Sequence, residues 1–194
     1  EAVLAFAEYV FNLRLPRHSK AWIEGWLAAM EGARATGDVE PARVLVEAPP
    51  ESAKTTTLVI FIAWWIGQHP ASTNGIVSVS DDQARKRAAL VAETIQNNPH
   101  WRDVFPNVVP DPDKSWGSDT GYEVRDRCDP SWKEKVASKV DPTLRSGGYG
   151  NRAWIGCRVT GILGLDDILD ENNTRSDREL EAVRRQPPLP LPRR

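Results

Sequence analysis

Apolar side chains recur at helical spacing along the N-terminal part of the chain. In residues 1–14 the apolar positions fall three and four residues apart, and Pro16 is placed to stop the helix that this spacing predicts. A second helix is expected to begin at Ser19, whose hydroxyl suits an N-cap. Its apolar face consists of Trp22, Ile23, Trp26, Leu27 and Met30. Residues 32–41 are polar and contain glycine and proline, so a loop is predicted there.

The most informative pattern is a strand, a tight loop and a helix in that order. Residues 42–48 form an apolar run with β-branched side chains, which predicts a strand that ends at a pair of prolines. Lys54 and Thr55 then open a segment, residues 55–68, whose spacing predicts a helix buried on most sides. A phosphate-binding loop needs this context, because backbone N–H groups and the positive end of the helix dipole hold the phosphates. In such a loop the lysine reaches the outer phosphates, and the threonine hydroxyl completes the coordination shell of a Mg²⁺ ion.

This loop departs from the usual phosphate-loop sequence at both glycine positions, which are occupied by Ala48 and Ala53. Glycine serves there because the loop can require positive φ, and because phosphate oxygens approach the backbone closely. A left-handed conformation at Ala53 is expected to cost about 1–2 kcal/mol. The alternative interpretation is a strand followed by a proline turn and a helix that happens to begin Lys-Thr-Thr.

A second strand and helix follow the loop unit. Residues 75–80 predict a short strand, and residues 83–97 predict a helix. Asp81 and Asp82 stand where a helix N-terminus favours negative charge. The helix carries a basic cluster, Arg85, Lys86 and Arg87. A solvated helix face is the favoured interpretation of this cluster, ahead of a contact with DNA or another subunit.

The following region predicts weaker elements. Residues 98–118 contain several prolines and two tryptophans, which indicates irregular structure laid over the sheet. Short strands are expected at residues 121–124, 135–138 and 143–145. Residues 146–150, Ser-Gly-Gly-Tyr-Gly, predict a flexible loop.

An apolar strand that ends in two adjacent carboxylates is expected in residues 156–167. Beside a phosphate loop, the first carboxylate, Asp166, can hold the Mg²⁺ shell, while Asp167 can orient or deprotonate an attacking water. Adjacent residues on a strand point to opposite faces, so the two acids can share one task only where the strand ends. An ordinary strand exit, where Asp is common, is the alternative. Combined with the Lys54 loop, the acidic pair indicates a nucleotide hydrolase.

Composition and charge restrict the choice of class. The chain has 194 residues, for which one domain is the default, and its 40% apolar and 27% charged fractions are typical of soluble globular proteins. A net charge of −2 gives no overall signature of nucleic-acid binding, so any such surface must be local. Cys128 and Cys157 lack metal-ligand spacing and favour a reducing compartment. We expect neither a secretory signal nor a membrane-spanning segment.

The motifs, taken in order, resemble the ATPase domain of the large terminase subunit, the DNA-packaging motor of tailed bacteriophages. The resemblance covers most of residues 15–185, and order and spacing carry more weight than any single motif. Its pieces are residues 15–26, 44–55, 78–84, 96–99, 143–150, 156–167 and 170–176. It implies an α/β P-loop NTPase core in residues 42–185, with a mainly parallel sheet and helices on both faces. Residues 1–41 would form a helical segment leading into this core. The family continues with another strand, whereas the proline-rich composition of residues 186–194 predicts an extended tail, for which a disordered terminus is favoured over docking in a partner's groove.

The resemblance also implies roles for matching residues. Lys54 would bind the β- and γ-phosphates, Thr55 and Asp166 would ligate Mg²⁺, and Asp167 stands at the position of the catalytic acid. The segment around His18 matches a region that helps to form the adenine pocket. The loop residues expected to contact ATP are Pro50, Glu51, Ser52, Ala53, Lys54, Thr55 and Thr56.

An arginine that acts across subunits is a further feature of some relatives. Arg158, with Arg145 and Arg152 as rivals, lies in the matching stretch and would stabilise charge on the transferring phosphoryl group. Two departures from the family pattern stand out. Many relatives carry an arginine at the position of Pro50, and the chain has no residues matching the nuclease domain that follows in the family.

The implied function is Mg²⁺-dependent ATP hydrolysis that drives double-stranded viral DNA into the procapsid, in the cytoplasm of the infected bacterial host. The implied partners are DNA, the portal, the small terminase subunit and further copies of the chain in a ring, without a membrane. One alternative is a nucleotide-binding or assembly module that lost turnover with its glycines. Another is a helicase-like P-loop ATPase, which would need further motifs after Asp167.

Overall fold

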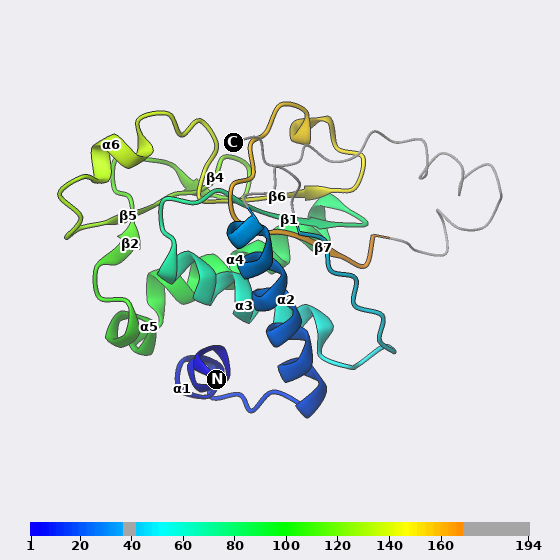
Figure 1. Ribbon diagram of the computed structural model, residues 1–194. Helices are drawn as coiled ribbons and strands as arrows, with labels where there is room; N and C mark the ends of the chain where they lie inside the picture. The colour runs from blue at the N-terminus through cyan, green and yellow to red at the C-terminus, as the bar shows by residue number, and fades with distance from the viewer. Residues whose placement is uncertain (37–41, 169–194) are drawn as a thin grey trace.

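The computed structural model describes residues 1–36 and 42–168, which form a mixed α/β structure around a five-stranded sheet (Figure 1). The strand order is β3-β4-β6-β1-β7. The strands are β3 (Trp116–Gly117), β4 (Gly121–Tyr122), β6 (Leu144–Gly148), β1 (Asn74–Ser78) and β7 (Leu163–Asp166). A separate antiparallel pair consists of β2 (Val108–Pro110) and β5 (Val124–Asp126).

The α/β class is confirmed, but the sheet is mixed rather than mainly parallel. Strand β1 pairs in parallel with β6 on one side and β7 on the other. Strand β4 pairs antiparallel with both β3 and β6. The antiparallel part is the short β3–β4 hairpin, because a tight turn can join only antiparallel strands.

Six α-helices lie in the described residues, and the first five of them lie on one side of this sheet. They are α1 (Ala2–Phe11), α2 (Arg17–Thr36), α3 (Lys54–Gln68), α4 (Asp81–Asn97), α5 (Pro99–Val104) and α6 (Trp132–Val136). In Figure 1, α1 to α5 lie below the sheet, while the single-turn 3₁₀ helix η1 (Arg152–Trp154) lies above it. Helix α6 lies on the same side as η1 in this view, and the loop carrying η1 packs on the second face through Trp154.

Two hydrophobic clusters correspond to these two faces. Ile76 of β1 joins the main cluster with buried residues of α1, α3 and α4, whereas the next residue, Val77, packs with Trp154 on the other face. This alternation follows from the period of two along a strand. A Cβ added at Gly75 would lie 2.8 Å from the Trp154 ring, so glycine at this position lets the indole pack directly on the sheet.

The N-terminal helices form as expected but with different ends. Helix α1 ends before Asn12, which adopts a left-handed conformation with φ 49°, several residues ahead of Pro16. Helix α2 begins at Arg17, so Ser19 is not its N-cap; this serine is buried and accepts a hydrogen bond from the Thr57 hydroxyl at 2.9 Å. Because α2 continues to Thr36, the loop predicted from residue 32 is wrong as far as residue 36, and residues 37–41 lie outside the described residues.

The strand predicted at residues 42–48 does not form. These residues have no regular secondary structure, and the side chains expected in the core are exposed, Val44 by 44% and Leu45 by 82%. The run contains only three consecutive large apolar residues between Arg43 and Glu47, and no described strand pairs with it. Strand propensity depends on such partners, and without them the pattern does not produce a strand.

Other weak predictions are also corrected. Residues 98–118 contain α5, β2 and β3 instead of only irregular structure, residues 135–138 overlap α6 instead of forming a strand, and residues 146–148 extend β6. The strand expected from residue 156 is limited to β7. By contrast, the helices predicted at 55–68 and 83–97 and the strand at 75–80 are confirmed with small shifts. Residues 170–176 and the tail at 186–194 fall outside the described residues.

Within the described ranges, no helix combines the length and the apolar character needed to cross a membrane.

Candidate functional site

The site is built on the loop of residues 49–53, which leads directly into α3. Ala53 stands immediately before the helix with φ 62° and ψ 25°, and Glu51 has φ 63°. The left-handed conformation expected at Ala53 is therefore present without the glycine that usually accommodates it. It turns the chain so that α3 begins at Lys54, and the first turn of this helix offers backbone N–H groups that have no partner within the helix.

Helix α2 holds this loop from outside. The His18 ring is 2.8 Å from the Ser52 carbonyl oxygen through Nε2, so its N–H donates to the loop backbone. The imidazole also contacts the Trp22 ring, with the ring centroids 4.8 Å apart. His18 thus fixes the loop conformation and is not among the residues that line the adjacent cavity. Its expected place in an adenine pocket stays a prediction.

The acidic pair lies at the carboxyl end of β7, against the start of α3. The Thr55 hydroxyl contacts both oxygens of the Asp166 carboxylate, at 3.0 and 2.9 Å, although the two residues are 111 positions apart in sequence. Strand β7 ends at Asp166, and Asp167 turns out of the strand with φ 47°. Its carboxylate consequently reaches the Lys54 ammonium at 3.6 Å. The condition set by the sequence, that the strand must end at the acidic pair, is met.

Parallel pairing brings further polar groups to the same edge. Ser78, the last residue of β1, is in register with Asp166, so the carboxyl ends of both strands meet there. In α/β sheets this edge is where ligands bind. Ser80 caps α4 by accepting a hydrogen bond from the Gln83 N–H at 3.3 Å, which directs the first turn of α4 toward the site.

Arg87 is the site residue that the sequence interpretation missed. Its guanidinium pairs with Asp166 and donates from Nη1 to the Ser78 hydroxyl at 2.9 Å and to the Gln83 side-chain oxygen at 3.1 Å. The Arg87 side chain is only 14% exposed, so the prediction of a solvated face is wrong for this residue. The expected exposure does hold for its neighbours Arg85 and Lys86, each paired with a surface aspartate.

The spacing of buried residues along α4 could have predicted that Arg87 is partly buried. Arg87 lies three residues after Ala84 and four before Val91, and both of these residues are completely buried. Positions three and four apart share one face of a helix, so Arg87 had to lie on or beside the inward stripe. An arginine on such a stripe needs an anionic partner, because burial of an unpaired charge is costly.

A cavity of about 600 Å³ opens beside these groups. Its lining consists of Pro50, Glu51, Ser52, Ala53, Lys54, Thr55, Thr56, Val79, Gln83 and Asp167. The volume is within the range of small-molecule sites. All loop residues that the sequence identified as ATP contacts therefore line one cavity, together with the second acid.

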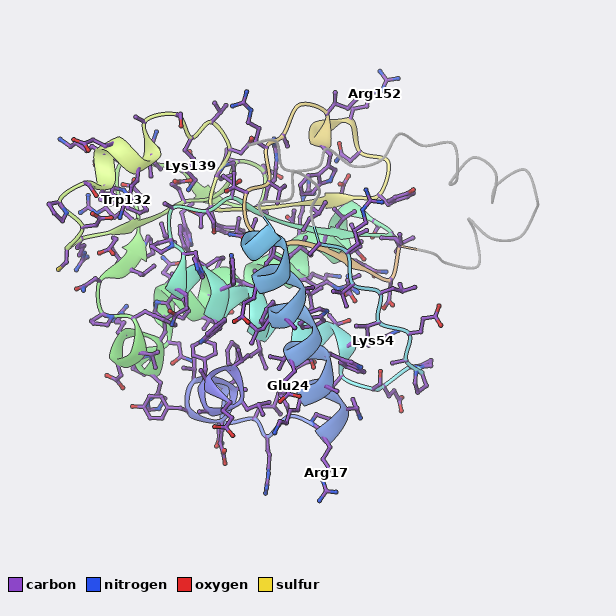
Figure 2. All side chains as sticks on the ribbon, in the orientation of Figure 1. Arg17, Glu24, Lys54, Trp132, Lys139 and Arg152 are labelled. Atoms are coloured by element: carbon purple, nitrogen blue, oxygen red, sulfur yellow. The ribbon has the colours of Figure 1, made fainter. Side chains whose placement is uncertain are left out.

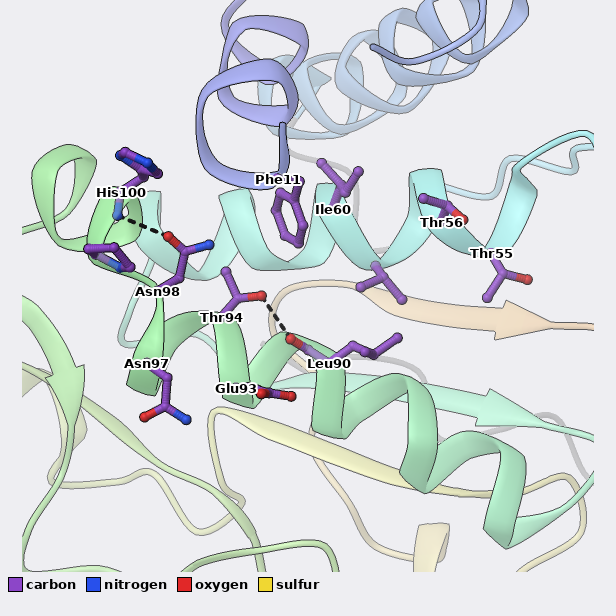
Figure 3. A pocket seen from close by; sticks show the side chains of 12 residues that line it. Phe11, Thr55, Thr56, Ile60, Leu90, Glu93, Thr94, Asn97, Asn98 and His100 are labelled. Carbon is purple, nitrogen blue, oxygen red and sulfur yellow. Dashed lines mark hydrogen bonds between the residues drawn. The ribbon is translucent and has the colours of Figure 1, made fainter. Parts of the chain in front are cut away.

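A second cavity, of about 550 Å³, lies between α1, α3 and α4 (Figure 3). Phe11, Ile60 and Leu90 project toward it, and it shares only Thr55 and Thr56 with the first cavity. Among the described residues that line it there is neither lysine nor arginine. It therefore lacks the cationic groups that would hold phosphates, and the cavity beside Lys54 is the better candidate for an anionic ligand.

The donor set at Thr55 and Asp166 fits Mg²⁺ on chemical grounds. A hydroxyl and a carboxylate are hard oxygen ligands, and here they already touch. Among the described residues there is no group of three or more His, Cys, Asp or Glu side chains that could hold a metal ion. This agrees with the way proteins bind Mg²⁺ through one or two carboxylates together with substrate phosphates and water.

The arginines proposed to act across subunits lie away from this cavity. Arg158 precedes β7, where its backbone N–H donates to Asp141 at 2.7 Å and its carbonyl accepts from Thr73, next to the amino end of β1. Arg145 pairs with Asp141 at 3.3 Å. Arg152 extends from a different side of the molecule than Lys54 (Figure 2). None of the three lines the chain's own cavity, and a role toward a neighbouring subunit stays a prediction.

Asp81 links the start of α4 to the end of β6 near the site. Its carboxylate accepts the Gly148 N–H at 2.6 Å and the Asn151 side-chain amide at 2.7 Å. These hydrogen bonds, that from Gly148 foremost, lower the pKa of Asp81. The ionised carboxylate therefore ties together two elements that frame the site.

Neither a scan against protein-family models nor a search of curated proteins found a match to this chain.

Proposed function

We propose that this chain binds ATP with Mg²⁺ in the cavity beside Lys54 and hydrolyses it. The observation that carries the proposal is the convergence of two distant segments: Thr55 on Asp166, and Lys54 on Asp167. A cation, a helix N-terminus and two carboxylates beside one cavity match the requirements of phosphoryl transfer.

Each residue has a definite part in the proposed reaction. Lys54 holds the β- and γ-phosphates, for which it exchanges its present partner Asp167. The carboxylate released from Lys54 can orient a water and accept its proton as the water oxygen attacks the γ-phosphorus. The bond from this phosphorus to the bridging oxygen of ADP breaks, and the products are ADP and inorganic phosphate. Mg²⁺, when bound, neutralises charge on the phosphate oxygens, with Thr55 and Asp166 as the protein groups that would hold it.

We further propose that the hydrolysis serves a DNA-packaging motor of the large-terminase type. This step is supported by the order and spacing of the motifs, of which the Lys54 loop and the acidic pair are now seen side by side. In that setting, copies of the chain would form a ring in the cytoplasm of an infected bacterium. The ring would act on double-stranded DNA with the portal and the small terminase subunit. With a net charge of −2, its DNA contact would be confined to local patches.

The test is release of phosphate from ATP in the presence of Mg²⁺. We expect turnover by the wild type and a loss of at least about 100-fold in Lys54→Ala and Asp167→Asn, because each removes a group that acts on the transferring phosphoryl. Lys133→Ala, which removes an exposed lysine of α6, is the matched control and should retain wild-type turnover. Absence of turnover in the wild type, or equal turnover in all variants, rejects the hydrolase.

A second candidate function is nucleotide binding without turnover, and one observation favours it. Glu51 and Ala53 both adopt left-handed conformations without being glycine, so each places a Cβ on a loop that phosphates must approach. Titration with ATP and with a non-hydrolysable analogue separates the two functions. Tight binding of both without phosphate release supports the binding module. Strand separation of duplex nucleic acid, which we do not expect, would support the helicase-like alternative.

A further inference from the structure

Arg87 occupies the place at Asp166 where a metal ion would carry positive charge. Asp166 is only 5% exposed, and Arg87 and the Thr55 hydroxyl both contact its carboxylate. The positive guanidinium of Arg87 therefore balances the negative charge of this buried carboxylate. The nucleotide-free site thus contains its own counter-ion.

A divalent ion at Thr55 and Asp166 would meet this resident charge. The guanidinium and the ion are both positive, and at short range in a partly buried site their repulsion strongly weakens binding of the ion. Arg87 pairs with Oδ2 of Asp166, so a metal ion bound there would have to share this carboxylate with the guanidinium. Arg87 and the metal ion therefore compete for one carboxylate.

The surroundings of Arg87 allow it to give way without entering solvent. Its Nη1 group is held by Ser78 at 2.9 Å and by Gln83 at 3.1 Å, and both contacts are independent of Asp166. Gln83 also lines the cavity beside Lys54. A guanidinium displaced from Asp166 would keep these two acceptors while moving toward the cavity wall.

We propose that Arg87 is a positioning residue that controls metal entry: it holds Asp166 neutralised and in place, and it yields the carboxylate only when Mg²⁺ arrives with a nucleotide. The triphosphate supplies the negative charge that outweighs the repulsion, so free Mg²⁺ binds poorly to the empty site. This inference rests on the proposed function, because it assigns the cavity to a Mg²⁺-nucleotide.

The test is binding of Mn²⁺, a spectroscopic substitute for Mg²⁺, to the nucleotide-free protein, measured through the electron paramagnetic resonance signal of the free ion. We expect Arg87→Gln to bind Mn²⁺ at least about tenfold more tightly than the wild type, because one repelling charge is removed. Arg85→Gln is the matched control, since it removes a charge from the same helix at an exposed position paired with Asp119. It should stay within about twofold of the wild type, as should the charge-preserving Arg87→Lys.

Unchanged or weakened Mn²⁺ binding in folded Arg87→Gln overturns the proposal, since a purely structural arginine predicts one of these results. If this variant does not fold, the decision comes from wild-type protein by NMR. The side-chain Nε–Hε resonance of Arg87, identified by its absence in Arg87→Lys, should shift when Mg²⁺-nucleotide binds, while that of Arg85 should not. An Arg87 resonance that stays in place overturns the proposal.

The two proposals can fail separately. Lys54-dependent ATP turnover combined with unchanged Mn²⁺ affinity in Arg87→Gln rejects the role of Arg87 alone. Tightened Mn²⁺ binding in a protein that never releases phosphate rejects the hydrolase alone.

Discussion

Replacement of Ala53 by glycine tests the backbone geometry on which the site is built. Ala53 has φ 62° at the entry to α3, a conformation that disfavours a Cβ by about 1–2 kcal/mol. Glycine removes this penalty but adds freedom to the unfolded chain, which costs about 0.4–1 kcal/mol. The net result is an expected gain of about 0.5–1 kcal/mol in the free energy of unfolding.

The same chemical change at Ala28 provides the control. Ala28 is an exposed residue inside α2, where the backbone is helical and glycine is unfavourable by about 1 kcal/mol. Urea denaturation at 25 °C, followed by circular dichroism, should therefore give opposite signs for Ala53→Gly and Ala28→Gly. For a chain of this length, each kcal/mol corresponds to a shift of about 2–4 °C in melting temperature.

The reasoning is refuted if Ala53→Gly destabilises the protein as much as Ala28→Gly does. That result would mean that Ala53 has an ordinary helical conformation, and the loop would then not turn into α3 as described. If Ala53→Gly raises the free energy of unfolding as expected, the loop keeps its shape in the variant. Its nucleotide affinity should then not fall below that of the wild type.

Two further predictions concern ion pairs and pH. Lys139 and Glu123, 2.7 Å apart with side chains 7% and 15% exposed, form a buried pair, so Lys139→Met should lower the free energy of unfolding by about 3 kcal/mol. In urea denaturation, the double variant Lys139→Met/Glu123→Gln should regain most of the free energy of unfolding lost in Lys139→Met. An equal loss in the single and the double variant would contradict the pairing. Asp81 has a lowered pKa in the folded state, so its stabilisation is present above the ordinary value of 3.8 and is lost as pH falls through the lower folded value. The stability difference between wild type and Asp81→Asn should therefore shrink from pH 7 to pH 3, and a constant difference would refute this role.

The strongly periodic parts of the chain could be predicted from the sequence. The buried helix after Lys54 and the helix ending at Asn97 have apolar positions at regular spacing, and both form within a residue or two of the predicted limits. The acidic pair at the end of an apolar run was likewise sufficient to place Asp166 and Asp167 beside the loop. The two helices and the acidic pair at the strand end each depend on the pattern of residues within one short segment of the chain.

Features that depend on distant partners were not predictable in the same way. The exposed residues 42–48 have strand-like composition, yet no described strand pairs with them. The loop that bears Trp154 covers a sheet face expected to carry helices, because Gly75 and Gly147 let the indole approach. Arg87 looked like one of three surface cations, and only its register with Ala84 distinguishes it from Arg85 and Lys86.

The central claim is that Lys54 and the Thr55–Asp166 contact act on one triphosphate. Calorimetric titration with a non-hydrolysable ATP analogue, in Mg²⁺ and again in EDTA, tests it without requiring turnover. We expect binding that weakens at least about tenfold in EDTA and also in Lys54→Ala, since a lost charge contact with phosphate costs 1.4 kcal/mol or more, roughly a factor of ten. Absence of binding, or binding indifferent to both Mg²⁺ and Lys54, would contradict the claim.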